Sequence, residues 1–302
     1  MAKVIVSALG FAFVIVAAFV ARSRGVLSAD AGRVLSEAMV CLTLPMAIVT
    51  SLNGAQVAVS DLYLVLMGIG LNALALLAAH LMGRRRGDSA ALMTGAAGFN
   101  VGNFALPFLS NVLGRSAVVT ASVFDVGNSV MCLGVNGAVI EHEASADGTR
   151  LTVRDALGTI VHSIPAMTYL TMITLCLLGL RLPQVVVDFA SVGAAANPFV
   201  AMATIGASID VACWDRGRMG AALRIVGARL VASLAQMAIV LLLPLPMSVK
   251  CVVCVLCLSP VASMGMVYAI RYDLDQTALA VANTIYVPLS LVTMSLCVIL
   301  LG

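Results

Sequence analysis

Long apolar segments make up almost the whole chain, and only short polar stretches separate them. Hydrophobic residues fill 62% of the 302 positions, and charged residues only 10%. A soluble domain has no way to bury so much apolar side chain, so the lipid bilayer must be the solvent. The segments are rich in alanine, valine and leucine and do not alternate between apolar and polar residues. That pattern favours a bundle of membrane helices over a membrane β-barrel.

The apolar segments predict ten membrane spans in an all-α polytopic membrane protein. The first segment is long enough to cross the bilayer. No small-residue cleavage site followed by a soluble domain marks it as a removable signal peptide. The predicted spans are residues 4–21, 31–53, 61–82, 89–113, 116–140, 155–180, 184–209, 221–245, 250–270 and 276–301.

The positive charges predict how these spans are oriented. With the N-terminus outside, the inside loops hold 13 of the lysines and arginines, Arg229 among them, and the outside segments hold 4. Such an excess on the inside is the usual orientation signal. We therefore expect a multi-pass protein of the bacterial inner membrane with both termini outside. The basic residues are scattered over membrane loops, so they indicate no nucleic-acid partner.

The spacing of four prolines predicts an internal repeat. Pro107 follows Pro45 by 62 residues, and Pro260 follows Pro198 by the same 62. The second pair lies 153 residues after the first, in the corresponding predicted spans. We expect two five-helix repeats, residues 1–150 and 151–302. Because five is odd, the two repeats must have opposite orientations, which is the inverted-repeat plan of secondary transporters.

The fourth and ninth predicted spans carry the residues most typical of a binding site. A proline within a span leaves backbone carbonyls without donors, which lipid does not tolerate, so each break should lie within protein or line a wet cavity. The alternative is a packed proline kink whose asparagines bond to backbone. The predicted substrate-binding residues of these spans are Asn100, Gly102, Asn103, Pro107, Ser259 and Pro260.

Asp125 is the most informative charge, because it lies near the middle of the fifth span. A carboxylate at that depth is costly and usually faces a cavity or a proton path. Asn128 lies one turn further on, so we predict that both residues take part in ion coupling. The alternative is a structural carboxylate satisfied by neighbouring donors. Asn283 and Thr284 occupy the equivalent part of the tenth span and are expected to complete the polar lining of the substrate site.

The cysteines and the remaining motifs do not predict an enzyme. Cys251, Cys254 and Cys257 repeat at every third position, but within an apolar span that has no histidine nearby. We interpret them as small buried hydrophobes and expect neither a metal nor a cofactor. Gly206–Asp210 superficially matches an intramembrane serine protease motif but lacks its final glycine.

Three segments resemble the auxin efflux carrier family of bacteria and plants. They are FNVGNFALPFL, NPFVAMATIGASI and LSPVASMGMVYAIRYDLDQTALAVANT. Two positions depart from the family pattern. Ala105 replaces a usual glycine, and Asp273 stands where a glycine normally follows Tyr272. The family pattern is otherwise carried by Phe99, Asn100, Gly102, Pro107, Pro198, Gly206, Ser259, Pro260, Tyr268, Tyr272, Asp275 and Thr284.

The resemblance implies two inverted five-helix repeats whose broken helices 4 and 9 cross at the substrate site. It implies a scaffold of helices 1, 2, 6 and 7, often forming a homodimer, and a moving transport domain of helices 3–5 and 8–10. Bacterial relatives are associated with small carboxylates such as malate or malonate, and the fold is shared with sodium-coupled bile-acid transporters. Asn100 and the backbone around Pro107 and Pro260 carry over as substrate-site elements.

The sequence thus predicts a secondary transporter of a small organic anion. It would work by alternating access, with an elevator-like movement and with proton coupling through Asp125. One alternative is a sodium-coupled organic anion symporter of the bile-acid-transporter type. The other is a membrane sensor that uses the same fold without transport.

Overall fold

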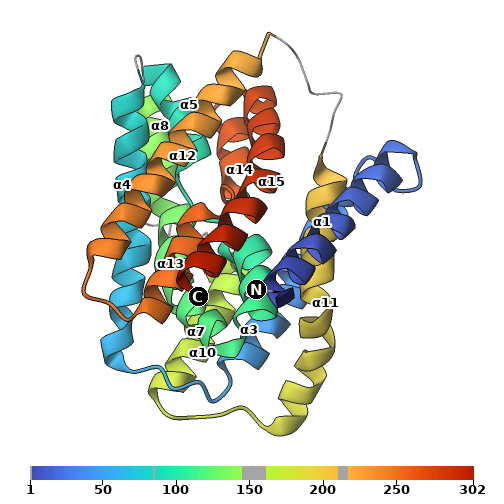
Figure 1. Ribbon diagram of the computed structural model, residues 1–302, viewed down its shortest axis with the longest axis vertical. Coiled ribbons are helices and arrows are strands. Elements are labelled where there is room, and N and C mark those ends of the chain that lie inside the picture. The colour runs from blue at the N-terminus through green and yellow to red at the C-terminus, as the bar shows by residue number, and fades with distance from the viewer. Residues whose placement is uncertain (1, 84–85, 145–160, 210–216) are drawn as a thin grey trace.

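The computed structural model describes residues 2–83, 86–144, 161–209 and 217–302. These residues form an all-helical structure, 84% helix, with no strands among them. Six helical stretches are long and apolar enough to cross a membrane, which supports a transmembrane protein (Figure 1). They are Ala31–Leu52, Val59–Met82, Arg115–Ala144, Gln184–Ser208, Met219–Leu242 and Gln276–Leu301.

The other predicted spans are shorter or interrupted, so single continuous helices do not account for all ten. Helix α1 (Ala2–Ser23) contributes the apolar stretch Leu9–Ser23, and α10 (Ile164–Leu177) has 14 residues. The predicted fourth span is divided into α5 (Arg86–Ala96) and α6 (Leu106–Val112). The predicted ninth span is divided into α13 (Met247–Leu258) and α14 (Met264–Arg271).

Pro107 does not interrupt the fourth span, in contrast to the expectation from the resemblance. The chain leaves helical geometry at Ala97–Asn100, and π-helix η3 (Val101–Ala105) then leads directly into α6. Pro107 is the second residue of α6, just as Pro45 is the second residue of α3 (Leu44–Leu52) after π-helix η1 (Met39–Thr43). The wider π turn absorbs the proline ring and its missing N–H. Only in the ninth span does the interruption, residues 259–263, contain the proline itself.

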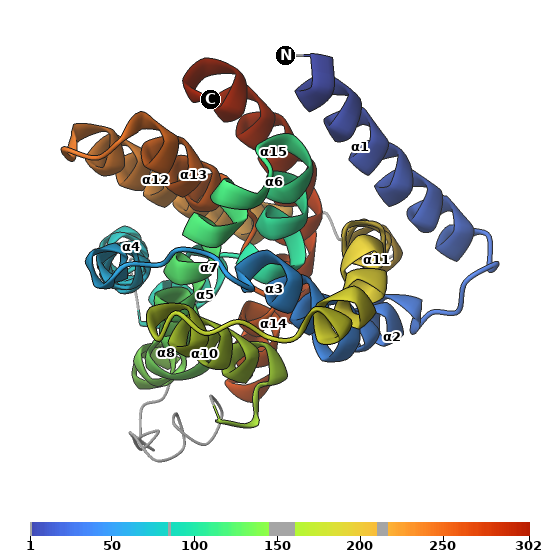
Figure 2. The same ribbon diagram turned by 90° about the horizontal axis from the view of Figure 1, so that it is seen from below.

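The helices pack in two groups. Helix α11 (Gln184–Ser208) packs on α1, α2 (Ala31–Ala38) and α3, and α10 packs on α3. In the other group, α4 (Tyr63–Met82) packs on α5, α7 (Arg115–Val130) and α12 (Met219–Leu242). Helix α12 also packs on α13 and α15 (Gln276–Leu301). Figure 2 shows α1, α2 and α11 at one side of the bundle and α4, α12 and α13 at the other.

Helices α4 and α7 of the second group approach each other closely. A Cβ atom on Gly127 would lie 2.0 Å from the backbone oxygen of Val65, so only glycine allows these helices to approach so closely. Helix α7 continues through π-helix η4 (Met131–Val135) into α8 (Asn136–Ala144). This tight pairing holds the asparagines of α4 and α7 beside the interrupted fourth span.

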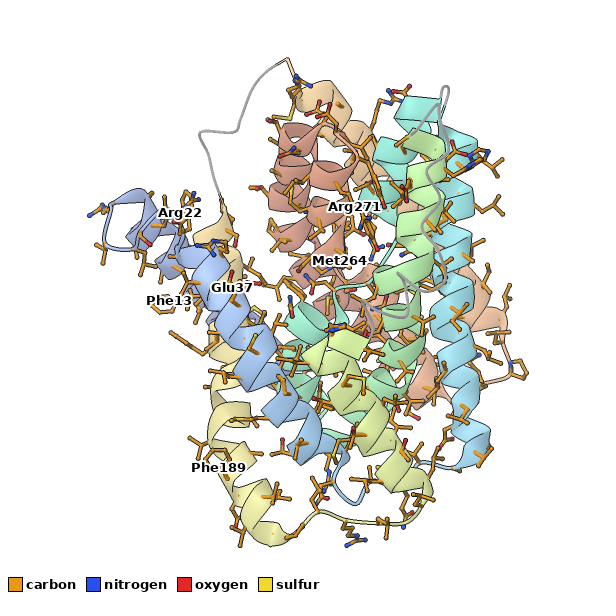
Figure 3. The ribbon with its side chains drawn as sticks, turned by 180° about the vertical axis from the view of Figure 1, so that it is seen from behind. Phe13, Arg22, Glu37, Phe189, Met264 and Arg271 are labelled. Carbon is orange, nitrogen blue, oxygen red and sulfur yellow. The ribbon has the colours of Figure 1, made fainter. Side chains whose placement is uncertain are left out.

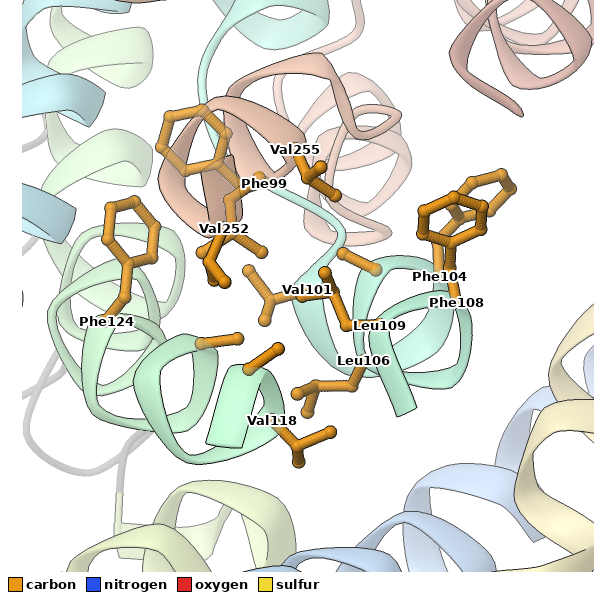
Figure 4. Close-up of a cluster of buried hydrophobic side chains, with 14 of the residues drawn as sticks. Phe99, Val101, Phe104, Leu106, Phe108, Leu109, Val118, Phe124, Val252 and Val255 are labelled. Atoms are coloured by element: carbon orange, nitrogen blue, oxygen red, sulfur yellow. The ribbon is translucent and has the colours of Figure 1, made fainter. Parts of the chain in front are cut away.

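The outer surface is apolar, as a bilayer requires. Phe13 on α1 and Phe189 on α11 are 73% and 71% exposed and point away from the bundle (Figure 3). The hydrophobic core packs around η3 and α6, where buried aromatic and branched side chains from three spans meet (Figure 4). These side chains include Phe99, Val101, Phe104, Leu106, Phe108, Leu109, Val118, Phe124, Val252 and Val255.

Candidate functional site

The two interruptions meet in the middle of the molecule. The Asn100 amide donates a 3.0 Å hydrogen bond to the Pro260 carbonyl, which joins segment 97–100 to segment 259–263. Gly98 adopts a φ of +84°, and a Cβ there would lie 2.9 Å from the Cβ of Ala262 and 2.8 Å from the sulfur of Cys132. The crossing therefore needs glycine for both its backbone conformation and its close approach.

Asparagine side chains satisfy the backbone of segment 97–100. Asn128 accepts a hydrogen bond from the Phe99 amide at 3.0 Å and donates one to the Phe99 carbonyl at 2.9 Å. Asn72 of α4 accepts from the Gly98 amide at 2.8 Å and donates to the Asn128 side chain at 3.2 Å. Asn136 donates to Asn72 at 3.2 Å. The amides replace hydrogen bonds that a continuous helix would supply, which lets this irregular segment lie inside a membrane protein.

Asp125 belongs to the same network. Asn128 donates a 2.7 Å hydrogen bond to Oδ1 of Asp125, and the carboxylate is only 5% exposed. The Tyr169 hydroxyl of α10 also interacts with this carboxylate and with Ser122. The predicted pairing of Asp125 with Asn128 is therefore present, and Asn128 links the carboxylate directly to the crossing.

Arg229 is the main cation at the crossing. It lies in the middle of α12 and is 1% exposed. Its Nη1 donates to the carbonyls of Ala96 at 2.5 Å and Gly98 at 3.0 Å, and its Nη2 donates to the Ser259 carbonyl at 2.7 Å. The guanidinium also faces the ring of Phe99, 5.1 Å from its centre. Ala96 and Ser259 lie at the C-terminal ends of α5 and α13, where carbonyls lack helical partners and the helix dipole attracts a cation.

The sequence interpretation of Arg229 was wrong. It counted this residue among the positive charges of the inside loops, whereas Arg229 is buried in a helix. Its depth, eight residues into the predicted eighth span, was the available signal, because an arginine at such depth usually marks a functional site. Asn72 was missed for a different reason, since one asparagine in an apolar helix gives no indication of its partner.

Some of the predicted residues of the fourth and ninth spans, among them Asn100 and Pro260, come together at the crossing. The Asn103 side chain donates to the Ser263 hydroxyl at 3.2 Å, which bridges the two interrupted spans. The Ser259 hydroxyl bonds within its own turn to the Leu256 carbonyl at 2.7 Å. Gly102 faces Leu44 of α3, where a Cβ would lie 2.8 Å from the leucine side chain. The Asn100 side chain is half-buried and makes no hydrogen bond to a described residue, so its amide is available for a ligand.

The other predicted lining residues are less clearly part of this site. Pro107 borders a separate cavity of about 190 Å³ between α3, α6, α7 and α11. The Thr284 hydroxyl bonds to the Ala280 carbonyl of its own helix at 2.9 Å. Within the described residues, no hydrogen bond joins Asn283 or Thr284 to the crossing. Tyr286 of α15 does reach it, because its ring lies 6.0 Å from the Arg229 guanidinium.

No protein-family model and no curated protein match this chain. The resemblance to auxin efflux carriers therefore rests on the quoted motifs alone.

Proposed function

We propose that this chain is a secondary active transporter that moves a small organic anion across the bacterial inner membrane by alternating access. The observation that carries the proposal is the crossing, where two interrupted spans meet through the Asn100–Pro260 hydrogen bond. Irregular backbone at membrane depth is expensive, and in transporters it marks the substrate site. A purely structural bundle would gain stability from continuous helices instead.

The chemistry of the crossing suits a carboxylate. Arg229 places a fixed positive charge within it, because arginine stays protonated in proteins. The side-chain amide of Asn100, which bonds to no described residue, and the Asn103–Ser263 pair offer donors beside that charge. Gly102, Pro107, Ser259 and Pro260 would shape the site through their backbone, with Asn283 and Thr284 as more distant lining residues. A small mono- or dicarboxylate fits this donor set better than a cation does.

The arrangement of the helices supports the proposed ten spans, the inverted repeats and the separate scaffold. Adding α1, α10 and the interrupted pairs α5–α6 and α13–α14 to the six long helices makes ten spans. The interruptions fall in corresponding spans of the two proposed inverted repeats, 1–150 and 151–302. The packing of α11 with α1, α2 and α3 supports a scaffold separate from the transport helices, and so an elevator-like movement. We also propose that the chain belongs to the auxin efflux carrier family, forms a homodimer and has both termini outside.

Ion coupling is assigned to Asp125 with Asn128. A proton is the proposed coupling ion, and the alternative is Na⁺ coupling of the bile-acid-transporter type. The binding and uptake test described next distinguishes the two ions, because it varies both pH and sodium. Asp125 is buried and linked through Asn128 to segment 97–100, so a change in its charge reaches the crossing directly.

The test is binding followed by uptake. Purified protein is screened by thermal shift against mono- and dicarboxylates at an acidic and a neutral pH, with and without sodium. Carboxylates that raise the melting temperature are then measured for uptake into proteoliposomes. Asn100→Ala should abolish uptake, whereas the matched control Asn111→Ala should retain it, because the Asn111 side chain bonds to Pro107 within its own helix. Binding without uptake in every condition would instead support a sensor.

A further inference from the structure

A second polar cluster lies where α7 meets α10. It consists of Ser122 and Asp125 on α7 and Tyr169 on α10. Ser122 precedes Asp125 by three residues, so both side chains lie on one face of the helix. Tyr169 interacts with both of them across the helix contact. We call these three residues the α7–α10 cluster.

The two hydroxyl groups of the cluster are buried, and the contacts of Tyr169 with Ser122 and Asp125 lack good hydrogen-bond geometry. Ser122 is 0% and Tyr169 1% exposed, and neither hydroxyl oxygen has a partner of hydrogen-bonding geometry. Such poorly satisfied buried hydroxyls are costly, so two of them beside one carboxylate need an explanation. Tyr169 interacts with both Ser122 and the carboxylate, so the three oxygen-bearing side chains lie close together, which points to a ligand coordinated by oxygen atoms.

The charge of the cluster is also unbalanced. On its own helix, Asp125 is faced by the neutral Asn128 and by Cys132, and from α10 it is faced by Tyr169. Arg229 of α12 packs over the Phe99 ring, and carbonyl oxygens accept hydrogen bonds from its Nη atoms. No described cation contacts the carboxylate in a salt bridge. A carboxylate within a membrane protein is costly unless a cation or a proton neutralises it.

Ser122 also gives the cluster a route of access. It lines the cavity of about 190 Å³ that α3, α6, α7 and α11 enclose, together with polar residues such as Ser110 and Asn197. Thr43 of η1 bonds to the Asn197 side chain at 2.8 Å, so this wall of the cavity is polar as well. The cavity therefore borders the face of α7 that carries Ser122 and Asp125.

We propose that Ser122, Asp125 and Tyr169 form a binding site for a small monovalent cation, taken up either as hydronium or as Na⁺. The shared chemistry is a hard cation with oxygen ligands: one carboxylate and two hydroxyls. This deepens the proposed function, since the cation would be the coupling ion. The site also connects the two moving parts of the proposed mechanism, because α7 belongs to the proposed transport group and α10 to the proposed scaffold group. A cation held by both would lock the two groups together, and its release would free them to move.

The experiment measures cation binding without requiring transport. Purified wild type and the variants Ser122→Ala, Tyr169→Phe and Asp125→Asn are compared by thermal shift. One arm titrates NaCl against choline chloride at constant ionic strength and neutral pH. The other arm varies the pH in choline chloride. Matched controls are Ser290→Ala, which removes another buried hydroxyl without a partner on α15, and Tyr63→Phe at the start of α4.

The expected result is a wild-type melting temperature that depends on Na⁺ or on pH, which identifies the cation. Asp125→Asn should abolish that dependence. Tyr169→Phe and Ser122→Ala should each weaken apparent cation affinity about tenfold, as the loss of one ligand to a charged group predicts, while the controls bind as wild type does.

Wild-type insensitivity to both Na⁺ and pH, or equal cation affinity in cluster and control variants, would overturn the site. Because Ser→Ala and Tyr→Phe each remove only one oxygen atom, these variants should fold even if Asp125→Asn does not. The proposed function fails separately: cation binding with no carboxylate uptake would leave this site intact and refute transport.

Discussion

The two interrupted spans are held by different chemistry. Segment 97–100 lies in a net of neutral amides from Asn72 and Asn128, which both donate and accept hydrogen bonds. In segment 259–263, the Ser259 carbonyl accepts from Arg229 and the Pro260 carbonyl accepts from the Asn100 backbone amide. Arg229 also donates to the Gly98 carbonyl of the first segment. The prolines suggest matching halves, but the supporting side chains do not match.

This difference separates two roles. The amide net ends at a carboxylate, so the first segment is connected to a group that can change its charge. The second segment depends on an arginine, whose charge does not change. One side of the crossing can therefore respond to an ion, while the other supplies a constant positive potential. Four substitutions test this contrast, from the largest expected effect to the smallest.

Replacing Arg229 with glutamine should damage both segments. The carbonyls of Ala96, Gly98 and Ser259 would lose their donors, and leaving buried acceptors unpaired should cost about 4 kcal/mol of unfolding free energy. Denaturant unfolding in micelles measures the loss. Arg224→Gln is the control on the same helix, since Arg224 is half-exposed and pairs with Asp88 at 3.1 Å, which should be worth about 1 kcal/mol or less. Equal losses would show that Arg229 does not hold the crossing.

Replacing Asn128 with alanine should damage only the first segment. The Phe99 amide and carbonyl and the Asp125 carboxylate would all lose a partner, for an expected cost of about 3 kcal/mol. Hydrogen exchange would localise the change. Faster exchange at Phe99 with unchanged exchange around Ser259 is expected, and uniform loosening of both segments would contradict the division described above.

Replacing Asp125 with asparagine should affect coupling more than stability. The change removes a buried charge but keeps the shape, so the stability cost should stay within about 1 kcal/mol. Uptake in proteoliposomes should lose its dependence on pH, or on sodium if sodium is the coupling ion. Asp188→Asn is the control, because that carboxylate is exposed on α11 and bonds to Gln184 at 2.8 Å. Uptake with a wild-type pH profile in Asp125→Asn would remove Asp125 from the coupling mechanism.

Replacing Asn103 with alanine should have the smallest effect on folding. Its 3.2 Å bond to Ser263 is exposed, so the loss should be below about 1 kcal/mol. If the pair holds substrate, carboxylate affinity should nevertheless fall about tenfold in the thermal-shift titration, and Asn111→Ala should leave it unchanged. Unchanged affinity in Asn103→Ala would restrict the substrate site to Asn100 and the backbone.

The positions of the six long helices could be predicted from the sequence, because a helix that crosses lipid needs a long apolar segment. The position of the interruption in the fourth span could not. Pro107 suggested it, but a π turn lets the helix pass through the proline, and the break falls at Ala97–Asn100, where side-chain amides substitute for helical bonds.

The sequence by itself determined an all-helical membrane protein, a buried Asp125 beside Asn128, and polar residues in the two spans that the structure shows to be interrupted. These follow from local composition and from the helical period. Only the tertiary structure decided that Arg229 and Asn72 hold the crossing. Arg229 bonds to Gly98 across 131 residues of chain, and Asn72 bonds to Asn128 across 56. Such partners are chosen by which helices pack together, and no local pattern of apolar residues contains that information.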